Sequence, residues 1–203
     1  NLFYNIGSPW GARGDQFLLS DQAMDSLTID HNTYDNGAGL PMNAAGGAHP
    51  TFIYQNNIAG VGSGGLGFFC DGGTLGPACL NLRFQPPAYV FLKNIIAGAV
   101  PASYPADNFL NPPANLGAVG FTDQTNRDYT LAPSSLYKNA GTDGKDVGAD
   151  IGVIESAVAG AGYFGAASGA QRATDYETEW YAITGAWPAG APDTSLTLVR
   201  LLP

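Results

Sequence analysis

The chain has 203 residues, of which 45% are hydrophobic and only 12% are charged, and its formal net charge is −9. Its eight Lys and Arg residues are scattered, so the chain lacks the clustered cations that bind phosphates; nucleic-acid binding is excluded, and binding to anionic lipid headgroups is disfavoured. No run of about 18 apolar residues is present, so the sequence predicts no membrane span. The 28 glycines and 14 prolines favour a turn-rich, all-β fold.

Four segments of the chain share one pattern that is centred on an asparagine. Mostly apolar residues stand two positions after the asparagine and three and five positions before it, and a glycine ends each segment. Apolar residues two apart point to one side of a strand, and asparagine tolerates left-handed backbone geometry. Each segment therefore predicts a strand, a turn and a second strand. The aligned asparagines are Asn1, Asn32, Asn56 and Asn94.

Segments of this kind bury their apolar face only when successive copies stack as coils. Stacking would align the apolar positions into columns and the asparagine side chains into a hydrogen-bonded ladder. The asparagines are unevenly spaced, as expected of a stack that carries insertions on one face. A β-sandwich is the alternative fold.

This pattern resembles the right-handed parallel β-helix repeats of pectate-lyase-like exported bacterial proteins, and the resemblance covers roughly residues 1–154. Its later segments look like the capping segment that follows the last coils in such proteins. The resemblance implies an all-β solenoid over residues 1–154 and a secreted or cell-surface location. Residues 155–203 begin Gly/Ala-rich and continue as short alternating stretches, which predicts a linker and an irregular β tail.

The chain begins at the ladder residue Asn1, without the strand that should precede it. The open end of a β-helix exposes an apolar face and unpaired backbone groups. We therefore expect a protein partner, or another subunit of an oligomer, to cover the N-terminal coil.

The two cysteines, Cys70 and Cys79, are too far apart for a CxxC redox or zinc motif. The loop between them is rich in glycine and can fold back, which favours a disulfide; two unpaired buried thiols are the alternative. A disulfide would place the protein in an oxidising compartment.

Three residues on one coil are candidate catalytic groups: Asp30, His31 and Asp35. The resemblance implies lyase chemistry, since pectate lyases bind Ca²⁺ through clustered carboxylates and use a basic residue as the Brønsted base. No carboxylate stacks on Asp30 in the next coils of the aligned pattern. Solvated turn carboxylates and a histidine set only by its position in the repeat are the alternative. A complete active site is therefore not expected in this chain.

A second group of carboxylates, in and after the DGKD sequence, consists of Asp143, Asp146 and Asp150. Their oxygens could hold a structural Ca²⁺, because the glycines permit a tight turn. A turn held by hydrogen bonds from the aspartate side chains to the backbone is the favoured alternative.

Aromatic residues supply a candidate carbohydrate-binding surface. In the predicted register Tyr54 points away from the core, and with Phe84 and Tyr89 it could form a platform on which sugar rings stack. A covering loop, tail or partner subunit would be the other explanation for apolar side chains on that face.

Two hypotheses for function follow. In the first, the chain belongs to an exported protein that binds or degrades a polysaccharide; an enzyme of this kind would be a polysaccharide lyase or a glycoside hydrolase, with its active site on upstream coils. In the second, the chain is a non-enzymatic structural or adhesive module of an extracellular assembly. The sequence favours a non-catalytic role for this part of the protein.

Overall fold

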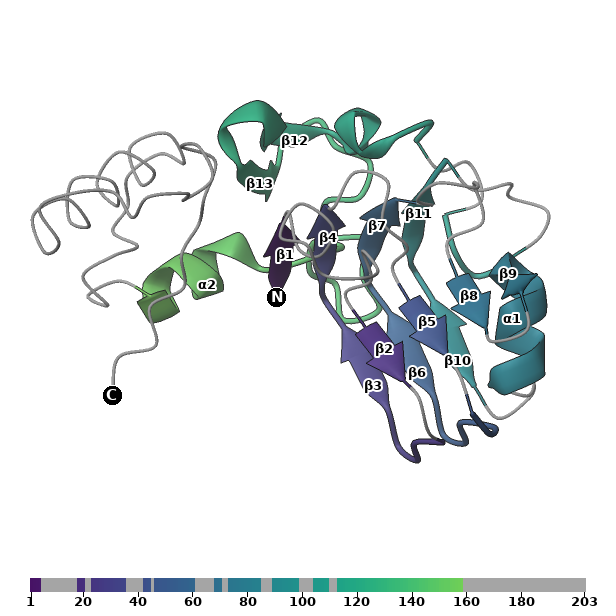
Figure 1. The fold of residues 1–203 in the computed structure, drawn as a ribbon. Coiled ribbons are helices and arrows are strands. Elements are labelled where there is room, and N and C mark those ends of the chain that lie inside the picture. Colours follow the sequence, from purple (N-terminus) through teal and green to yellow (C-terminus); the bar gives the residue numbers. More distant parts are fainter. Residues whose placement is uncertain are drawn as a thin grey trace, which may run out of the picture. The chain divides into compact units, whose positions relative to one another are not determined.

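The computed structural model describes residues 1–4, 18–20, 23–35, 42–44, 46–60, 68–70, 73–84, 89–98, 104–109 and 113–158. Strands predominate in these ranges and helices are few, in agreement with the predicted all-β class (Figure 1). The chain divides into two units. The first holds Asn1–Thr122 and Tyr129–Ile151, and the second holds Asp123–Asp128 and Gly152–Pro203.

Most of the described strands of the first unit lie in three sheets whose pairings are parallel except at one edge, and the chain visits these sheets in a fixed cyclic order: first, third, second. The first sheet contains β1 (Leu2–Tyr4), β4 (Thr33–Asp35), β7 (Ile58–Gly60) and β11 (Ile95–Ala97). The second contains β3 (Thr28–Asp30), β6 (Ile53–Gln55) and β10 (Val90–Leu92). The third contains β2 (Leu18–Ser20), β5 (Met42–Ala44) and β8 (Phe68–Cys70), with β9 (Thr74–Leu75) antiparallel to β8.

The strand register corrects one position of the predicted asparagine ladder. In the first sheet, Thr33 pairs with Ile58, and Ile58 pairs with Ile95. The residue before each strand of this sheet is an asparagine, and in the third copy that asparagine is one position later than predicted. The prediction of Asn56 is therefore wrong. The ladder positions are Asn1, Asn32, Asn57 and Asn94.

The residue just before each internal ladder asparagine makes the corner between the second and first sheets. His31, Asn56 and Lys93 all have left-handed backbone, with φ of 49°, 55° and 53°. The prediction that the ladder asparagine itself takes this geometry is also wrong. In the third copy Asn56 forms the corner and Asn57 joins the ladder. Both residues are asparagines, and an asparagine at either position would suit the left-handed corner. The sequence pattern could not separate them.

The ladder asparagines form a continuous chain of amide hydrogen bonds. Nδ2 of Asn1 donates to Oδ1 of Asn32 at 3.1 Å, and Nδ2 of Asn32 donates to Oδ1 of Asn57 at 3.0 Å. Asn57 continues to Asn94 at 3.1 Å, and Asn94 to Asn108 at 3.0 Å. The same acceptor oxygens also bind the backbone N–H of the preceding copy, as Asn57 Oδ1 does for Asn32 at 3.0 Å. The ladder therefore satisfies buried polar groups at every corner.

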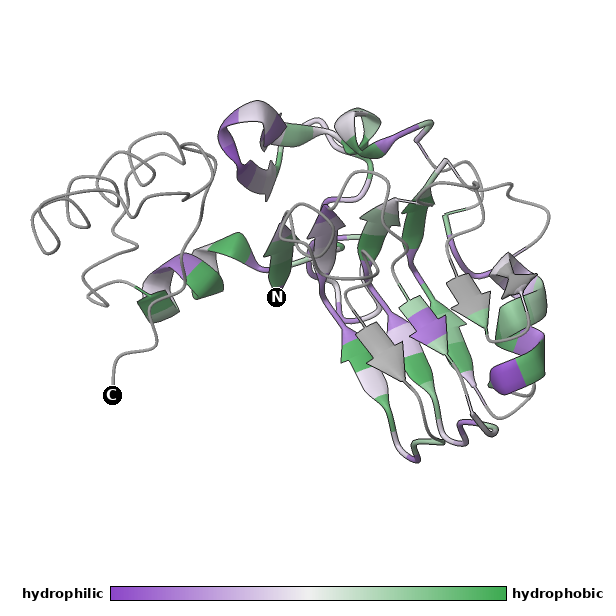
Figure 2. Cartoon of the chain, viewed as in Figure 1, coloured by the Kyte–Doolittle hydropathy of each residue, from purple (hydrophilic) through white to green (hydrophobic). Residues whose placement is uncertain are grey.

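The aromatic core lies directly behind this ladder. Ile29, Tyr54 and Phe91 align across the second sheet and are buried. The ring of Tyr54 stacks on that of Phe91, with centroids 5.2 Å apart, and the ring of Phe52 lies 3.9 Å from that of Phe84. Each such pair contributes about 1 kcal/mol beyond area burial. Figure 2 shows the hydrophobic residues that continue along β1, β7 and β11.

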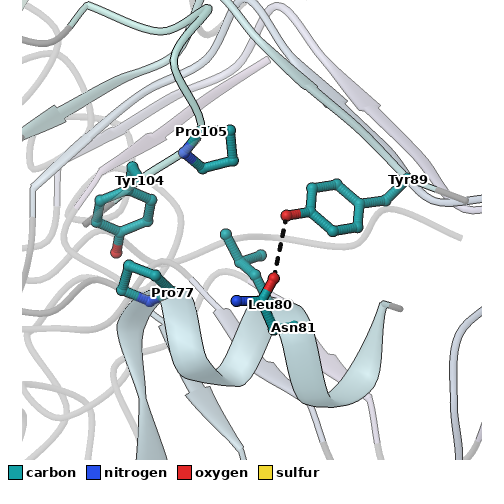
Figure 3. Close-up of a pocket in the computed structure, with 6 residues that line it drawn as sticks. All are labelled: Pro77, Leu80, Asn81, Tyr89, Tyr104 and Pro105. Carbon is teal, nitrogen blue, oxygen red and sulfur yellow. Dashed lines mark hydrogen bonds between the residues drawn. The ribbon is translucent and has the colours of Figure 1, made fainter. Parts of the chain in front are cut away.

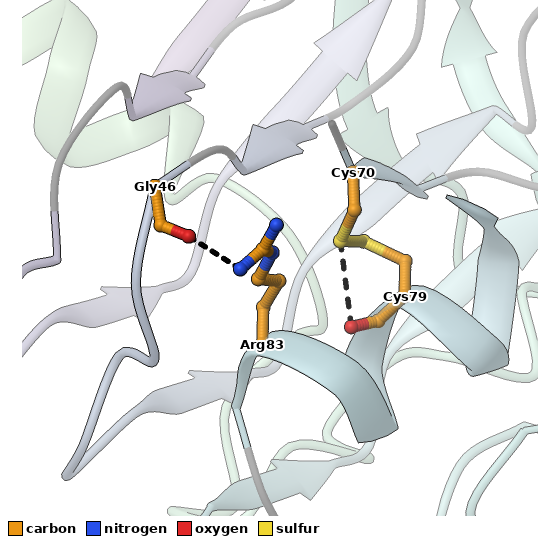
Figure 4. Close-up of a disulfide and its surroundings, with 4 residues drawn as sticks. All are labelled: Gly46, Cys70, Cys79 and Arg83. Atoms are coloured by element: carbon orange, nitrogen blue, oxygen red, sulfur yellow. Dashed lines mark hydrogen bonds between the residues drawn. A yellow bond between two sulfur atoms is a disulfide. The ribbon is translucent and has the colours of Figure 1, made fainter. Parts of the chain in front are cut away.

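The helix α1 (Gly76–Arg83) is fastened to β8 by a disulfide. Cys70, at the end of β8, is bonded to Cys79 of α1, so the predicted disulfide is present (Figure 4). Leu80 on the same helix is completely buried. At the helix end, the Arg83 guanidinium donates to the carbonyl oxygen of Gly46, which ties α1 to the loop that follows β5.

A capping segment follows the last parallel strand. It contains two short 3₁₀ helices, a two-stranded sheet and a loop that packs onto the first sheet. At Gly148, where φ is +91°, a Cβ atom would lie only 2.6 Å from Thr33 Oγ1. The next residue, Ala149, donates its N–H to that Oγ1 at 2.9 Å. The segments are η3 (Leu116–Val119), β12 (Phe121–Asp123), η4 (Gln124–Asn126) and β13 (Asp128–Leu131).

The predicted domain boundary at residue 154 falls inside a helix. The helix α2 spans Ile151–Val158, so residues 155–158 of the predicted linker are helical. The rest of the predicted linker and tail, residues 159–203, lies outside the described residues. Among the described helices, none has the length and apolar character needed to cross a membrane.

Replacing Asn57 with alanine should strongly destabilise the fold. The change removes the acceptor for two groups of Asn32 and the donor to the carbonyl oxygens of Ile29 and Gln55. Buried groups left without partners cost about 1–3 kcal/mol each, so we expect a loss of about 3 kcal/mol in the free energy of unfolding, measured by urea titration. The control is Leu136→Ala, at a side chain 85% exposed, which should change stability by less than about 0.5 kcal/mol. Equal effects of the two changes would contradict the ladder's role.

Removing the disulfide should also destabilise the chain. The double variant Cys70→Ala/Cys79→Ala loses a cross-link that spans nine positions of sequence. Such a short loop restricts the unfolded chain modestly, so the expected loss is about 2–3 kcal/mol in the free energy of unfolding. A reductant should destabilise the wild-type protein by a similar amount and leave the double variant unchanged. If a reductant left the free energy of unfolding of the wild-type protein unchanged, that result would contradict the assignment of the disulfide.

Candidate functional site

A pocket with a volume of about 320 Å³ opens in the first unit between α1 and two segments that flank β10 and β11 (Figure 3). This volume lies at the lower end of the range of ligand pockets, about 300–1,000 Å³, and suits a small ligand or a short stretch of polymer. The lining residues are two tyrosines, two prolines, a leucine and an asparagine: Pro77, Leu80, Asn81, Tyr89, Tyr104 and Pro105.

Three separate segments bring these residues together. Pro77, Leu80 and Asn81 lie three and four positions apart on α1, which places them on one face of the helix. Tyr89 directly precedes β10, and Tyr104 belongs to the segment that follows β11. Because the disulfide fixes α1 to β8, it also fixes one wall of the pocket relative to the sheets.

The polar groups of the pocket are partly organised in advance. The hydroxyl of Tyr89 lies 3.4 Å from Oδ1 of Asn81 and can donate to it, as the dashed line in Figure 3 marks. This long hydrogen bond orients the amide of Asn81. Within the described part of the chain the amide nitrogen has no such partner, which leaves it as a donor for a ligand.

Both pocket tyrosines keep a neutral phenol at physiological pH. Burial raises the pKa of Tyr104 well above the ordinary value of 10.0, and burial also raises the pKa of Tyr89. A neutral phenol offers an aromatic face together with a hydroxyl that both donates and accepts. The ring of Tyr104 also stacks on that of the core residue Phe91, with centroids 5.9 Å apart, which limits its movement.

Of the three residues that were expected to form an aromatic platform, the structure places only Tyr89 at the surface. Tyr89 lines the pocket, but Tyr54 and Phe84 have no exposed surface and belong to the aromatic core. The prediction for Tyr54 is wrong because the register is shifted by one in that copy, and a shift of one residue exchanges the faces of a strand. The prediction for Phe84 is wrong because this residue directly follows α1, a helix that the sequence pattern did not reveal, and its ring packs against that of Phe52.

Sequence reasoning missed Asn81 and Tyr104. Asn81 lies just after Cys79, in a stretch for which the sequence pattern predicts no helix and which forms α1. Tyr104 begins the sequence YPADNFL, one of the later segments that resemble a capping segment. That sequence contains Asn108, the last member of the amide ladder, and an asparagine ahead of an apolar pair was the signal that could have placed Tyr104 beside the coils.

A second polar site surrounds His31 at the corner before β4. Nδ1 of His31 lies 3.1 Å from the carbonyl oxygen of Gly148, so this nitrogen is the donor. Nε2 lies 3.3 Å from Oδ1 of Asp143 and 3.8 Å from Oδ1 of Asp30. These are ion-pair distances for a protonated imidazole, although Nε2 lacks hydrogen-bond geometry and has no surface open to solvent.

The neighbouring polar groups tie this corner to the capping segment. Asp30 accepts from Gln55 Nε2 at 2.8 Å and from Asn56 Nδ2 at 2.9 Å. Asn56 also donates to Thr142 Oγ1 at 2.9 Å and accepts from the N–H of Thr142 at 2.8 Å. Both oxygens of Asp30 therefore accept hydrogen bonds from the protein. The hydrogen bonds around His31 and Asn56 join this corner to the capping segment.

The candidate catalytic residues therefore do not form an open acid–base pair. A general base must reach its proton at about 2.6–3.2 Å, and Nε2 of His31 is enclosed by protein. Asp35 has a different partner: it accepts a 2.6 Å hydrogen bond from the hydroxyl of Tyr129. The structure places Asp30 beside His31 but gives Asp35 a separate role in holding the cap.

The predicted calcium group does not form. In the described ranges there is no cluster of three or more His, Cys, Asp or Glu residues that could hold a metal ion. Asp146 accepts from Lys138 Nζ and from the N–H of Asn139, both at 2.9 Å. Asp143 accepts from the N–H of Lys145 at 3.0 Å, the side-chain-to-backbone turn that was the favoured alternative. Asp150 is exposed.

Comparisons with protein-family models, curated proteins and solved structures gave no match to this chain. The candidate site is therefore interpreted from its geometry and chemistry.

Replacing Asp143 with asparagine should flatten the acid limb of the stability curve. The N–H of Lys145 and the neighbouring His31 hold the pKa of Asp143 below its ordinary value of 3.8. A lowered folded-state pKa means that the unfolded chain takes up the proton first as pH falls. The stabilisation is present above pH 3.8 and is lost as pH falls from there through the folded-state value. Asp143→Asn should therefore lose less stability across this window than the wild-type protein.

The measurement is the free energy of unfolding by urea at several pH values between 6 and 2. Asp25→Asn is the matched control, because Asp25 is exposed and bonded only to the adjacent Ser26 hydroxyl. If the profiles of wild-type protein and Asp143→Asn stay parallel down to the lowest pH, the acid sensitivity of the free energy of unfolding does not come from this carboxylate.

Proposed function

We propose that this chain is the parallel β-helix portion of an exported protein that binds polysaccharide, and that the pocket beside α1 is its carbohydrate-binding site. The single observation that carries the proposal is the pocket itself, in which Tyr89 and Tyr104 stand with the side-chain amide of Asn81. The proposal for the fold and the proposal for the ligand rest on separate arguments.

Three parallel sheets visited in cyclic order support the β-helix. A chain that returns to each sheet one strand further on winds as a solenoid, and the continuous amide ladder is what stacked, register-matched coils would produce. Crossovers between parallel strands are almost always right-handed, which supports that hand. The disulfide supports export, because such bonds persist mainly in oxidising compartments.

The chemistry of the pocket supports a sugar ligand. A pyranose ring presents C–H groups on its faces and hydroxyls around its edge. The aromatic faces of Tyr89 and Tyr104 suit the apolar face of such a ring, and aromatic residues with a polar handle serve surfaces that are part apolar and part wet. The amide of Asn81 and the phenol hydroxyls suit the ring hydroxyls. The modest volume of the pocket suits one short segment of a polysaccharide chain.

The pocket supports binding better than catalysis. None of its six described lining residues is a carboxylic acid or a histidine, which most often act as general acids and bases. The raised pKa of Tyr104 keeps its phenol protonated, which opposes a role as a Brønsted base. We therefore propose a non-catalytic, carbohydrate-binding role for this site.

A structural or adhesive module of an extracellular assembly is the second candidate. The observation that favours it is β1, at the edge of the first sheet: in the described part of the chain, no strand pairs with its outer side. Tyr4 on this strand is 40% exposed. An open strand edge is a template for pairing with another chain. Oligomers that grow with protein concentration in sedimentation experiments, without glycan binding, would favour this candidate.

Tyr89→Ala should weaken glycan binding by about fivefold, since an aromatic contact contributes about 1 kcal/mol beyond area burial. Tyr89→Phe keeps the ring and loses only the hydroxyl that contacts Asn81, so its effect should be smaller. Binding is measured by affinity electrophoresis against soluble polysaccharides and by calorimetry with their oligosaccharides. Leu136→Ala, outside the pocket, is the control, and a urea titration checks that each variant folds. A folded Tyr89→Ala that binds as tightly as wild-type protein would remove the pocket from the proposal.

A further inference from the structure

We propose that the pocket selects neutral sugars and discriminates against uronic acids, an inference that rests on the proposed carbohydrate-binding function. Proteins that bind polyuronates need cations, or a metal ion, to pair with a carboxylate on each sugar. The walls of this pocket are uncharged, and the cations of the described chain are engaged elsewhere.

The lining of the pocket contains no charge. The six lining residues are tyrosine, proline, leucine and asparagine. The adjoining sequence segments, 85–88 and 99–103, are also free of charged residue types. A carboxylate entering the pocket would lose part of its hydration without gaining a cationic partner, and a buried charge without a partner is costly. A ring hydroxyl in the same place can exchange hydrogen bonds with the Asn81 amide and the phenols.

The cations nearest to the pocket in sequence have other partners. Arg83 ends the same helix, but its guanidinium donates to the carbonyl oxygen of Gly46 (Figure 4). Lys93 follows β10, and its Nζ lies 5.8 Å from the ring centre of Phe109. In the cap, Lys138 pairs with Asp146 at 2.9 Å. Neither these groups nor any other cation of the described residues lines the pocket.

The field of the whole chain acts in the same direction. The formal net charge of −9 repels an anionic polymer at low ionic strength, where screening is weak. Burial raises the pKa of both pocket tyrosines, so the lining stays uncharged through neutral and mildly alkaline pH. Binding of a neutral glycan should accordingly vary little with salt or with pH between about 5 and 9, since no group in the lining titrates there.

The test compares matched oligosaccharides on the whole chain. Calorimetry is run with neutral gluco-, manno- and galacto-oligosaccharides and with oligogalacturonate and oligoguluronate of the same length, each with and without Ca²⁺. We expect at least one neutral series to bind, and every uronate to bind about tenfold more weakly or not at all. The Ca²⁺ arm tests for metal-bridged uronate binding, which would overturn the inference.

A charge variant makes the comparison sharper. Asn81→Lys places a cation at the exposed helix position of the pocket and should narrow or reverse the preference, strengthening uronate binding about tenfold and making it salt-dependent. Asn81→Gln is the matched neutral control and should keep the preference of the wild-type protein. An unchanged preference in folded Asn81→Lys would show that the discrimination does not arise in this pocket and would overturn the inference.

The outcomes separate this inference from the proposed function. Tight uronate binding that Tyr89→Ala weakens would overturn the neutral-sugar preference and leave the pocket as a glycan site. Absence of binding to every oligosaccharide would overturn both. Neutral-sugar binding that depends on Tyr89 and is insensitive to salt would support both.

Discussion

The amide ladder is the interaction on which the rest of the structure depends. Each buried asparagine uses its side-chain oxygen to accept from the backbone and side chain of one neighbouring copy and its side-chain nitrogen to donate to the other. A slip of one residue in any copy would break bonds on both sides of it. The ladder therefore fixes the register of the short parallel strands, which by themselves are too brief to specify it.

The sequence predicts the class of fold and most of the ladder, because asparagines followed by apolar residues recur in alignable segments. It fails where two asparagines adjoin. Asn56 takes the left-handed corner and Asn57 the ladder, and only the strand pairing distinguishes them. That single step reverses the expected direction of Tyr54, which fills the aromatic core instead of facing a ligand.

The candidate site was predictable only at Tyr89, whose copy has the correct register. The other pocket residues depend on features that no repeat encodes. The second cysteine lies inside a helix, Gly76–Arg83, whose disulfide holds it against the third sheet, and Asn81 of that helix lines the pocket. Tyr104 arrives because Asn108 extends the ladder fourteen residues past Asn94 in a segment that matches no other copy. Contacts between residues far apart in the sequence, such as this disulfide and this hydrogen bond, cannot be predicted from a local sequence pattern.

The low charge of the chain links the cap to the pocket. With few basic residues available, the cap holds Lys138 and Lys145 against Asp146 and Asp143, while the second carboxylate of the corner, Asp30, is satisfied by amides. The hydrogen bonds of Asn56 with Thr142 and of His31 with Gly148 hold the cap loop to the corner between the second and first sheets, and no side chain would fit at Gly148. The lining of the pocket, in contrast, holds only uncharged side chains. A sugar ligand of the kind proposed would therefore be recognised by stacking on the tyrosines and by hydrogen bonds to its hydroxyls.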